Sequence, residues 1–526
     1  MTLNRSATLA MRRLLEALRP AAISMLCASV GALGALSSRS AESPASAATQ
    51  SVPSETGAYA PKRFTAQHVG IFNGRSVRYR VQSGDTNLVD EHGLIGSIFS
   101  FSYLKEGVTD PSSRPVTFIY NGGPGSSSVW LHLGVLGPKR VKLDRDVNPS
   151  TLPPYVLEAN PDCLLDITDL VFIDPIGTGF SRIRGHGKPE DFYGVDRDAA
   201  SIAQFISAWM TENGRWNSPK YLVGESYGTI RSAVIMRMLM GGPVYGGVLN
   251  AISINGITLL GSVLEAGATE GGDQDYVYRL PNFAATAWYH GKIDKAGRTL
   301  ETFVNEAEQF AETDYSHALF SGSRLSQDKR QSIAATLSSF TGISAEDILA
   351  ANLRISNRIF AHNLLASANQ DVGLYDSRYT LTRGTELAAD EVGDDPAMAR
   401  YTPAFNAAWH DYLLQDLGVR LNEPYETIVW KGVNAVWDYD RAGVPKSQSY
   451  AAEFAAAMRR NPELKILVAS GYFDLVTPFM SAEYTLAQAG VPLDRVRFTR
   501  YASGHMVYVG GTASEFAADM RRLYVR

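Results

Sequence analysis

The chain has 526 residues, of which 45% are hydrophobic and 20% are charged, and its formal net charge is −5. This composition excludes a wholly disordered chain, and the mixed charges form no long basic stripe of the kind that binds nucleic acid. The length suits one large domain with a sizeable insertion, or two to three domains.

The N-terminal segment has the pattern of an export signal. Arg12 and Arg13 precede an uncharged run over 21–36, which is shorter than the roughly 20 residues that a membrane-spanning helix needs. We therefore predict a signal peptide at 1–37 and a periplasmic or extracellular protein, with an uncleaved anchor as the alternative. Residues 38–66 are rich in Ser, Ala, Pro and Thr, which predicts a disordered linker. No other segment is expected to enter a membrane.

Cysteine usage is sparse. The chain contains Cys27 and Cys163, and Cys27 would leave with the signal peptide. The mature protein would then hold one thiol and no internal disulfide, and a chain of this size can rely on its core instead.

The first part of the mature chain predicts a sheet. Alternating apolar and polar residues between His68 and Glu106 indicate antiparallel strands at a sheet edge. Two continuous apolar runs, Val116–Tyr120 and Leu170–Ile173, are typical of buried strands. Each runs directly into a glycine-containing loop, at 121–128 and at 174–181.

A third unit of this kind surrounds Ser226. A β-prone run, Tyr221–Val223, precedes the serine, and Ile230–Met240 is rich in helix-forming residues. Gly224-x-Ser226-x-Gly228 fits the nucleophile elbow, a turn so tight that small neighbours are needed and the serine oxygen stands above the sheet edge. The pattern alone is weak, because a chain with 46 glycines can produce it by chance.

The order of elements predicts an α/β domain with an insertion. Strands that alternate with crossover segments, such as the amphipathic stretch 195–210, indicate a parallel sheet, to which 248–255 would add a further strand. From 260 to 440 this alternation stops. We assign 67–259 and 441–526 to the two parts of the sheet domain and 260–440 to a helical cap. The predicted elements outside the first part are helices over 300–319, 328–340, 449–460 and 514–525 and strands over 465–470 and 495–501.

A nucleophilic serine requires a base and an acid that orients the base. In this topology the acid and then the histidine follow the serine, each on a loop at the carboxyl end of a strand. Of the nine histidines, only His505 lies beyond the strand 465–470, just after the last strand. Asp474 follows the preceding strand, whereas its competitor Asp494 stands at the start of a strand, on the wrong edge of the sheet.

Acyl transfer also requires N–H donors for the oxygen that becomes negative when the serine attacks, an effect worth several kcal/mol. One donor would be the N–H of Tyr227, directly after the nucleophile. The other would come from the loop that begins at Asn121, where five consecutive small or turn-forming residues indicate close approach of the backbone to a ligand.

Taken together, these motifs resemble the serine carboxypeptidase family. The resemblance extends from Tyr120 to Met506, although the cap is not matched motif by motif. It rests on Asn121-Gly-Gly-Pro-Gly-Ser-Ser, Asp174-x-x-Gly-x-Gly-x-Ser181, Gly224-Glu-Ser-Tyr-Gly228, Asp474 and Gly504-His-Met506, in that order.

The resemblance implies an α/β-hydrolase fold, with a mostly parallel central sheet flanked by helices and an inserted helical cap. It implies a catalytic triad, two oxyanion donors and two residues that bind the free carboxylate at the substrate's C-terminus. The triad is Ser226, Asp474 and His505, the donors are the N–H groups of Gly123 and Tyr227, and the carboxylate-binding residues are Asn121 and Glu225.

Three positions depart from the family pattern. Ser126 stands where the family usually has a cysteine, so sensitivity to thiol reagents should be absent. Ile119 replaces a usual tryptophan, and Val135 occupies the place of a second carboxylate-binding glutamate. Half of the carboxylate-recognition network is therefore missing while the triad is complete.

The resemblance implies an exported serine carboxypeptidase that cleaves C-terminal residues from peptides through an acyl-enzyme. A serine acyltransferase or esterase is the alternative that Val135 permits, and a catalytically silent binding protein is a third. Glu225 would bind a substrate carboxylate when one of the two is protonated, or would only support the elbow. The sequence contains no metal-ligand cluster, phosphate loop or dinucleotide fingerprint, so no cofactor is expected. The expected partners are peptides with a free C-terminus.

Overall fold

The computed structural model describes residues 59–143, 152–241, 251–265, 272–384 and 392–525. The predicted signal peptide, 1–37, and most of the predicted linker, 38–66, lie outside these residues. The end of that linker is structured, contrary to expectation, because strand β1 begins at Arg63. Just before it, the Tyr59 hydroxyl donates to Asp85 Oδ2 at 2.8 Å, which ties the entering chain to the sheet.

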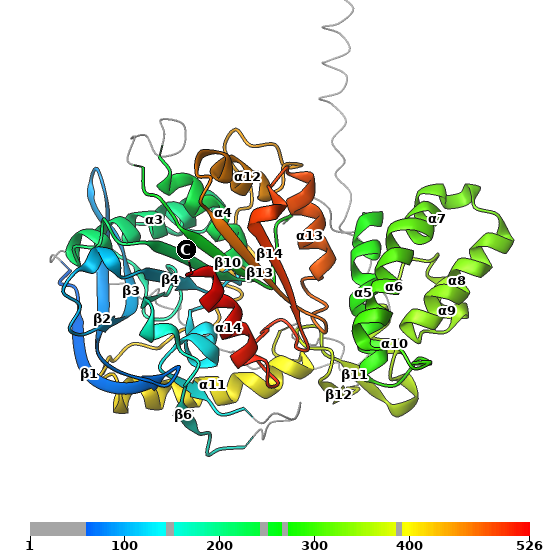
Figure 1. Cartoon of the computed structure of the whole chain (residues 1–526), viewed down its shortest axis with the longest axis horizontal. Helices are drawn as coiled ribbons and strands as arrows, with labels where there is room; N and C mark the ends of the chain where they lie inside the picture. Colours follow the sequence, from blue (N-terminus) through cyan, green and yellow to red (C-terminus); the bar gives the residue numbers. More distant parts are fainter. Residues whose placement is uncertain (1–58, 144–151, 242–250, 266–271, 385–391, 526) are drawn as a thin grey trace, which may run out of the picture. The chain divides into compact units, whose positions relative to one another are not determined.

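The core of the described chain is a ten-stranded sheet with the order β1-β2-β3-β7-β4-β9-β10-β13-β14, in which β8 pairs with β3 (Figure 1). Strands β1 to β3 are antiparallel, as predicted for this edge. The strands β7, β4, β9, β10, β13 and β14 run parallel to one another. The strands are β1 (Arg63–Phe72), β2 (Arg75–Asp90), β3 (Gly93–Lys105), β4 (Val116–Tyr120), β7 (Asp169–Ile173), β8 (Arg182–Ile183), β9 (Lys220–Glu225), β10 (Gly256–Leu260), β13 (Lys465–Gly471) and β14 (Val496–Tyr501).

The parallel strands inside the sheet, β4, β7, β9, β10 and β13, are buried on both faces, whereas the edge strand β14 is partly exposed. Successive side chains of a strand point to opposite faces, so each inner strand contributes to two cores. In β4, Phe118 belongs to one buried apolar cluster and Ile119 to the other, and in β13 Ile466 and Leu467 divide in the same way. Helices cover each face. On one side lie α3 (Val195–Glu212), α4 (Tyr227–Leu239) and α12 (Ala451–Arg460), and on the other α2 (Val129–Leu131), α11 (Pro396–Gln415) and α14 (Ala513–Leu523).

The segment predicted as a helical cap, 260–440, divides into two parts. Its first six helices share an apolar core of their own, which also takes in residues of the loop after β13 and of α13 (Phe479–Gln488). Helix α11 instead packs into the core beneath the sheet. The six helices are α5 (Asp273–Tyr289), α6 (Leu300–Phe310), α7 (Ser316–Ser321), α8 (Gln327–Thr341), α9 (Ala345–Ala350) and α10 (Asn357–Asn363), and they are drawn in green in Figure 1.

Short strands complete the described elements. Two of them, within the insertion, form a small separate sheet, and two others pair after β4. They are β11 (Gln370–Val372) with β12 (Thr380–Thr382), and β5 (Lys139–Val141) with β6 (Leu157–Ala159). Within the described ranges, no helix combines the length and apolarity needed to cross a membrane.

One predicted strand was wrong. Residues 251–255, the described part of the expected strand 248–255, carry no strand, and β10 begins at Gly256. A strand buried on both faces reads as a continuous apolar run, as β10 does, whereas the alternation over 248–255 is typical of a half-buried one. Asn255 instead links β10 to β9, because its backbone N–H donates to Lys220 O at 2.8 Å.

Candidate active site

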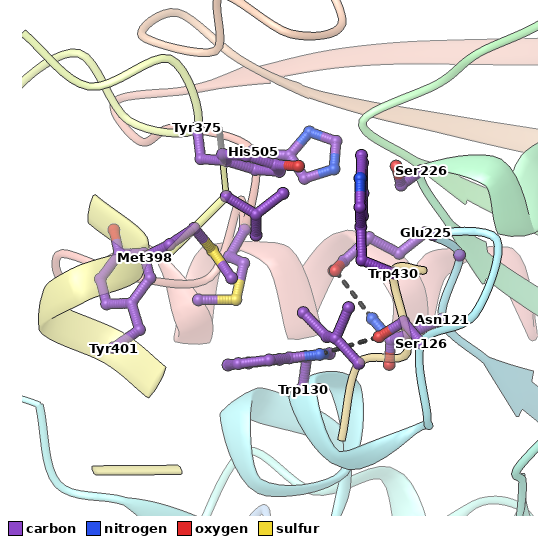
Figure 2. A pocket seen from close by; sticks show the side chains of 15 residues that line it. Asn121, Ser126, Trp130, Glu225, Ser226, Tyr375, Met398, Tyr401, Trp430 and His505 are labelled. Atoms are coloured by element: carbon purple, nitrogen blue, oxygen red, sulfur yellow. Dashed lines mark hydrogen bonds between the residues drawn. The ribbon is translucent and has the colours of Figure 1, made fainter. Parts of the chain in front are cut away.

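The parallel strands bring the predicted site residues to one edge of the sheet. The loop at Asn121 follows β4, the turn at Ser226 follows β9, Asp474 follows β13 and His505 follows β14. Because the carboxyl ends of parallel strands meet at the same edge, four distant parts of the chain converge there. Ser226 and His505 line one pocket, shown in Figure 2.

The turn at Ser226 has the strained backbone of a nucleophile elbow. Ser226 has φ 58° and ψ −129°, a conformation that a residue with a side chain rarely adopts. A Cβ on Gly224 would lie 2.2 Å from Gly228 O, so only glycine fits before the turn. Ser226 N donates to Leu260 O at 2.9 Å, which joins the turn to the end of β10. Ser226 keeps some exposure to solvent, whereas every residue of β9 before it is buried.

Asp474 and His505 form a buried pair. Asp474 Oδ2 lies 2.8 Å from His505 Nδ1, and Asp474 Oδ1 accepts from the N–H groups of Val476 and Thr477 at 2.9 and 3.0 Å. The Thr477 hydroxyl donates to Asp474 Oδ2. Burial alone would lower the pKa of His505, but the charge and hydrogen bond of Asp474 outweigh it and raise that pKa above the ordinary 6.5.

The imidazole of His505 reaches toward the elbow. A Cβ on Gly261 would lie 2.8 Å from the His505 ring. Glycine at this position, directly after β10, therefore lets the ring approach the backbone closely. No hydrogen bond joins Ser226 Oγ to His505 in the structure. Such bonds are often long without substrate and shorten when it binds.

The insertion holds the loops of the acid and the histidine in place. Asn282, on α5, donates its side-chain amide to Asp474 O at 2.9 Å. His505 N donates to Tyr375 O at 2.6 Å, and the two rings meet edge to face. Arg378 donates to Ala502 O at 2.7 Å, so 375–378 forms one wall of the histidine loop.

The glycine loop after β4 lies against the elbow. A Cβ on Gly122 would come within 2.5 Å of Tyr227 N, and Gly123 has φ +99°. Tyr227 opens helix α4, and the first N–H groups of a helix lack partners within it. Arg231, buried and paired with Asp198 at 2.7 Å, donates to Asn121 O and supports this loop from below.

Two further segments join at the rim. Asp174 Oδ1 accepts from Ser128 N at 2.9 Å and from the Tyr425 hydroxyl at 3.2 Å. Burial raises the pKa of Asp174 to about 6. Ile428 bridges Ser126, and Trp430, two residues further, lines the pocket. The segment that begins at Trp430 therefore reaches the pocket, whereas the aromatic stretch 276–289 belongs to α5 and to the cap's own core.

Asn121 and Glu225 meet inside the same pocket. Asn121 Nδ2 donates to Glu225 Oε1 at 2.8 Å (Figure 2). Asn121 Oδ1 accepts from Leu131 N at 3.1 Å. Burial raises the pKa of Glu225 to about 7, and the nearby charge of His505 lowers it only in part. Glu225 Oε2 is buried and has no hydrogen-bond partner. A neutral glutamic acid with a free oxygen can share a proton with a carboxylate ligand.

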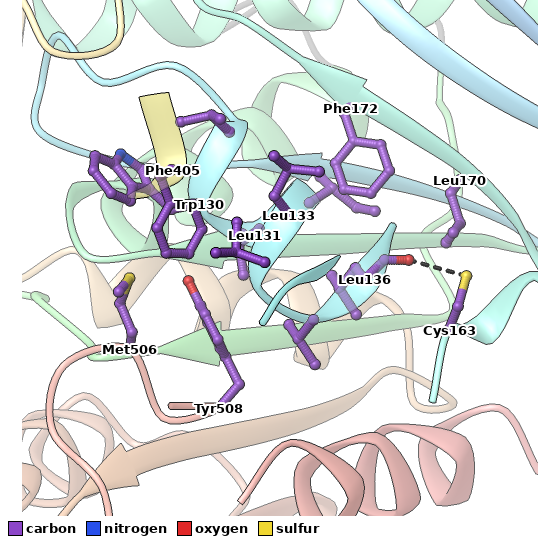
Figure 3. Close-up of a cluster of buried hydrophobic side chains, with 14 of the residues drawn as sticks. Trp130, Leu131, Leu133, Leu136, Cys163, Leu170, Phe172, Phe405, Met506 and Tyr508 are labelled. Carbon is purple, nitrogen blue, oxygen red and sulfur yellow. Dashed lines mark hydrogen bonds between the residues drawn. The ribbon is translucent and has the colours of Figure 1, made fainter. Parts of the chain in front are cut away.

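The position expected to hold a second glutamate is apolar and closed. Val135 is fully buried and does not line the pocket. It belongs to the same apolar cluster as its neighbours Leu133 and Leu136, which Figure 3 shows.

Tyr508, three residues after His505, packs against the segment that contains Val135. Its ring packs so closely on Gly134 that a Cβ there would lie 2.3 Å from it. Its buried hydroxyl, which like Glu225 Oε2 has no hydrogen-bond partner, lowers the pKa of Glu225. Cys163, whose thiol donates to Leu136 O, is buried with a pKa of about 12, and so it is unreactive.

Several residues around the site have little or no signal in the amino-acid sequence. Thr477 lies three residues after the acid, and a search for hydroxyls near Asp474 could have found it. Tyr508, Tyr375 and Asn282 carry no local signal, since each reaches the site only through long-range packing. The competing acid, Asp494, is exposed in a short 3₁₀ turn before β14, away from the pocket.

Comparisons with known proteins agree with this architecture. A family model described as serine carboxypeptidase matches residues 97–526. Among curated relatives, a pheromone-processing carboxypeptidase kex1 of Sclerotinia sclerotiorum is 31% identical over 150 residues, which cover 28% of this chain and 21% of that protein. Serine carboxypeptidase-like 20 of Arabidopsis thaliana is 30% identical over 147 residues, 28% of each chain. The matched stretch thus spans less than a third of either relative.

A solved structure shows the same fold. Kex1(delta)p, a prohormone-processing carboxypeptidase from Saccharomyces cerevisiae, superposes with a TM-score of 0.50 at 14% identity, covering 85% of this chain and 91% of that one. At this identity the likeness concerns the fold alone. The predicted class, an α/β-hydrolase with a mostly parallel sheet between helices, is confirmed.

Proposed function

The chain belongs to the serine carboxypeptidase family, and on that basis we propose that it is an exported enzyme that removes C-terminal residues from peptides through an acyl-enzyme. One observation carries the proposal: the Asn121–Glu225 pair, joined at 2.8 Å, lies in the pocket that Ser226 and His505 line. A group that can bind a terminal carboxylate therefore lies beside a candidate nucleophile.

In the first half-reaction, Ser226 Oγ attacks the carbonyl carbon of the last peptide bond while His505 takes the hydroxyl proton. Asp474 holds the imidazole through Nδ1, so the other ring nitrogen faces the serine. The carbonyl oxygen becomes negative and accepts hydrogen bonds from the N–H groups of Gly123 and Tyr227. His505 then gives its proton to the departing amine, the C–N bond breaks, and the C-terminal residue leaves.

In the second half-reaction, a water molecule replaces the departed amine. His505 takes a proton from this water as its oxygen attacks the acyl carbon, and the same oxyanion donors serve again. The bond to Ser226 Oγ then breaks, and the proton returns from His505 to the serine. The products are the shortened peptide and the restored enzyme, and the cycle consumes one water.

Glu225 gives the reaction its preference for a free C-terminus. Protonated Glu225 donates a hydrogen bond from Oε2 to the substrate carboxylate. Asn121 holds the other oxygen of Glu225, Oε1. Above a pH of about 7 the ionised Glu225 repels that carboxylate, because burial has raised its pKa to about 7. In this proposal the Tyr508 hydroxyl, rather than a glutamate at position 135, adjusts the pKa of Glu225.

The test compares two substrates that differ in one group. A blocked dipeptide with a free C-terminus and the same peptide amidated are each incubated with the purified protein. We expect cleavage of the acid and at least about tenfold slower cleavage of the amide, since the amide forfeits a charge-assisted hydrogen bond. Ser226→Ala is the control and should cleave neither.

The alternative is a serine acyltransferase or esterase on the same scaffold, which the apolar Val135 favours. It predicts the opposite ranking, with the ester or amide preferred over the acid. A silent binding protein would show no labelling of Ser226 by an organophosphonate. Thus the same preparation distinguishes the three functions.

Export rests on the N-terminal pattern of Arg12 and Arg13 followed by the uncharged run over 21–36. Sequencing the N-terminus of the protein recovered outside the cytoplasm checks this part of the proposal. We expect a mature start near residue 38. A protein that keeps its first residues and stays in the cytoplasm would contradict export without affecting the proposed chemistry.

A further inference from the structure

Beside the carboxylate-binding pair, the pocket has a wall made of apolar and aromatic side chains. The pocket encloses about 610 Å³, including its opening to solvent. Figure 2 shows Met398 and Tyr401 on the side of the pocket opposite Ser226. The residues of this wall, which we call the apolar wall, are Trp130, Val392, Met398, Tyr401, Ile428 and Met506.

The polar atoms of the apolar wall already have partners. Trp130 Nε1 donates to Ser126 Oγ at 3.0 Å, and the Tyr401 hydroxyl donates to Asp376 Oδ2 at 3.3 Å. Among the described residues that line the pocket, there is one acidic residue, Glu225, and one histidine, His505. This lining contains no lysine, arginine or aspartate. A charged ligand group placed against this wall would therefore lose its water without gaining a counter-ion.

The geometry assigns the apolar wall to the side chain of the residue that leaves. In a C-terminal residue the scissile nitrogen, the carboxylate and the side chain all branch from one Cα. The carbonyl carbon of the scissile bond must lie at Ser226, and the C-terminal carboxylate must lie at Glu225. The side chain of the leaving residue must then point to the remaining side of the pocket. That side is the wall of Met398 and Tyr401.

We propose that the enzyme selects peptides that end in a large, uncharged apolar residue, such as leucine, methionine or phenylalanine, because that side chain packs on the apolar wall. This inference rests on the proposed carboxypeptidase function. Burial of an apolar side chain favours binding, whereas a terminal lysine or glutamate would have to bury an unpaired charge.

Met398 is the main determinant of this selection. It stands in the first turn of α11, where its N–H donates to the capping residue Asp395 at 3.1 Å, so its position is held by the helix start. Its side chain is flexible and polarisable, and such a side chain adapts to ligands of different shape. We therefore expect tolerance among apolar residues and discrimination against charged ones.

The first experiment is a series of blocked dipeptides that differ only in the last residue. We expect kcat/KM for leucine, methionine and phenylalanine to exceed that for glycine by about 10-fold and those for lysine and glutamate by about 100-fold. Lysine or glutamate within about threefold of leucine would overturn the proposal.

The second experiment changes the wall. Met398→Asp places an anion in the first turn of α11, a position that suits acidic residues, and should raise the ratio of lysine to leucine cleavage at least about 10-fold. Met398→Leu is the matched control and should keep the original ranking. An unchanged lysine-to-leucine ratio in Met398→Asp, with Ser226 still labelled by an organophosphonate, would remove Met398 from this role.

A binding experiment distinguishes failure of this inference from failure of the proposed function. The same peptides are titrated into Ser226→Ala by calorimetry, which requires no cleavage. A ranking of leucine above lysine and glutamate supports the apolar wall even if the intact protein cleaves no peptide. Equal affinities overturn the selection even if the protein proves to be a carboxypeptidase.

Discussion

Two buried carboxyl groups lie at the site, and their surroundings differ: Asp474 is paired with His505, and Glu225 lines the pocket. Asp474 is surrounded by four donors, which are two backbone N–H groups, the Thr477 hydroxyl and His505 Nδ1. Glu225 accepts from Asn121 at 2.8 Å, and its second oxygen has no hydrogen-bond partner. A carboxylate with every lone pair occupied can hold a histidine in one orientation. One with a free oxygen and a pKa of about 7 can take a proton and offer it to a ligand.

Burial alone therefore does not decide whether a carboxyl group orients a histidine or binds a ligand. Both carboxyl groups are almost fully buried, at 0% exposure for Asp474 and 4% for Glu225. The donors around each oxygen decide whether an oxygen stays free for a ligand. We therefore call Asp474, Thr477 and His505 the nucleophile corner and Asn121, Glu225 and Tyr508 the carboxylate corner, and test them separately.

The largest effect should come from the nucleophile corner. Asp474→Asn removes the charge that orients His505, and kcat should fall about 10⁴-fold. The loss should be equal for the free-acid and the amidated peptide, because this corner does not touch the substrate carboxylate. A loss confined to the acid substrate would show that the two corners are not independent.

Arg231 tests the support beneath the carboxylate corner. Arg231→Met leaves the buried Asp198 without its partner, and the free energy of unfolding should drop by about 3–5 kcal/mol. The matched control removes an arginine from a more exposed pair, Arg298 with Glu306, and should cost no more than about 1 kcal/mol. Urea denaturation followed by circular dichroism measures both. Similar losses in the two variants would contradict the buried role of Arg231.

Glu225→Gln should change the pH profile for acid substrates. In the native protein, the protonated form is present below a pH of about 7 and is lost as the pH rises through that value. kcat/KM for the free-acid peptide should therefore fall about tenfold per pH unit above 7, whereas glutamine, which does not titrate, removes this fall. The amidated peptide serves as the control, since its rate should lack the alkaline fall in both proteins. An unchanged profile for the variant would remove Glu225 from carboxylate binding.

The smallest effect should come from Tyr508. Its hydroxyl lowers the pKa of Glu225, so Tyr508→Phe should raise that pKa further and move the alkaline fall to a higher pH, by about one unit or less. KM for the acid substrate should rise a few-fold at most, because neither the Tyr508 hydroxyl nor Glu225 Oε2 has a hydrogen-bond partner in the structure.

Tyr412→Phe is the matched control for this change. It also deletes a buried tyrosine hydroxyl, but one that meets Tyr103 at 3.0 Å away from the pocket. Its pH profile should be that of the unmodified protein. A shift to lower pH in Tyr508→Phe, or an equal shift in both variants, would contradict the contact between Tyr508 and Glu225.

The parts of the site that follow a strand directly were open to prediction. The loop at Asn121 and the turn at Ser226 are local patterns, because glycine is required where a backbone approaches another closely. The order of strands then placed Asp474 and His505 at the same edge. The expected strand at 248–255 was placed too early, because the buried strand begins only at Gly256.

The order of elements, the α/β class and the family could all be inferred from the amino-acid sequence, because strand periodicity and glycine-bearing turns are local properties. The folded chain was needed to show that Val135 points into the core, that Tyr508 reaches Glu225, and that Met398 faces the pocket. These contacts join residues that are distant along the chain. No periodicity encodes them, since they depend on how helices and loops pack around the sheet.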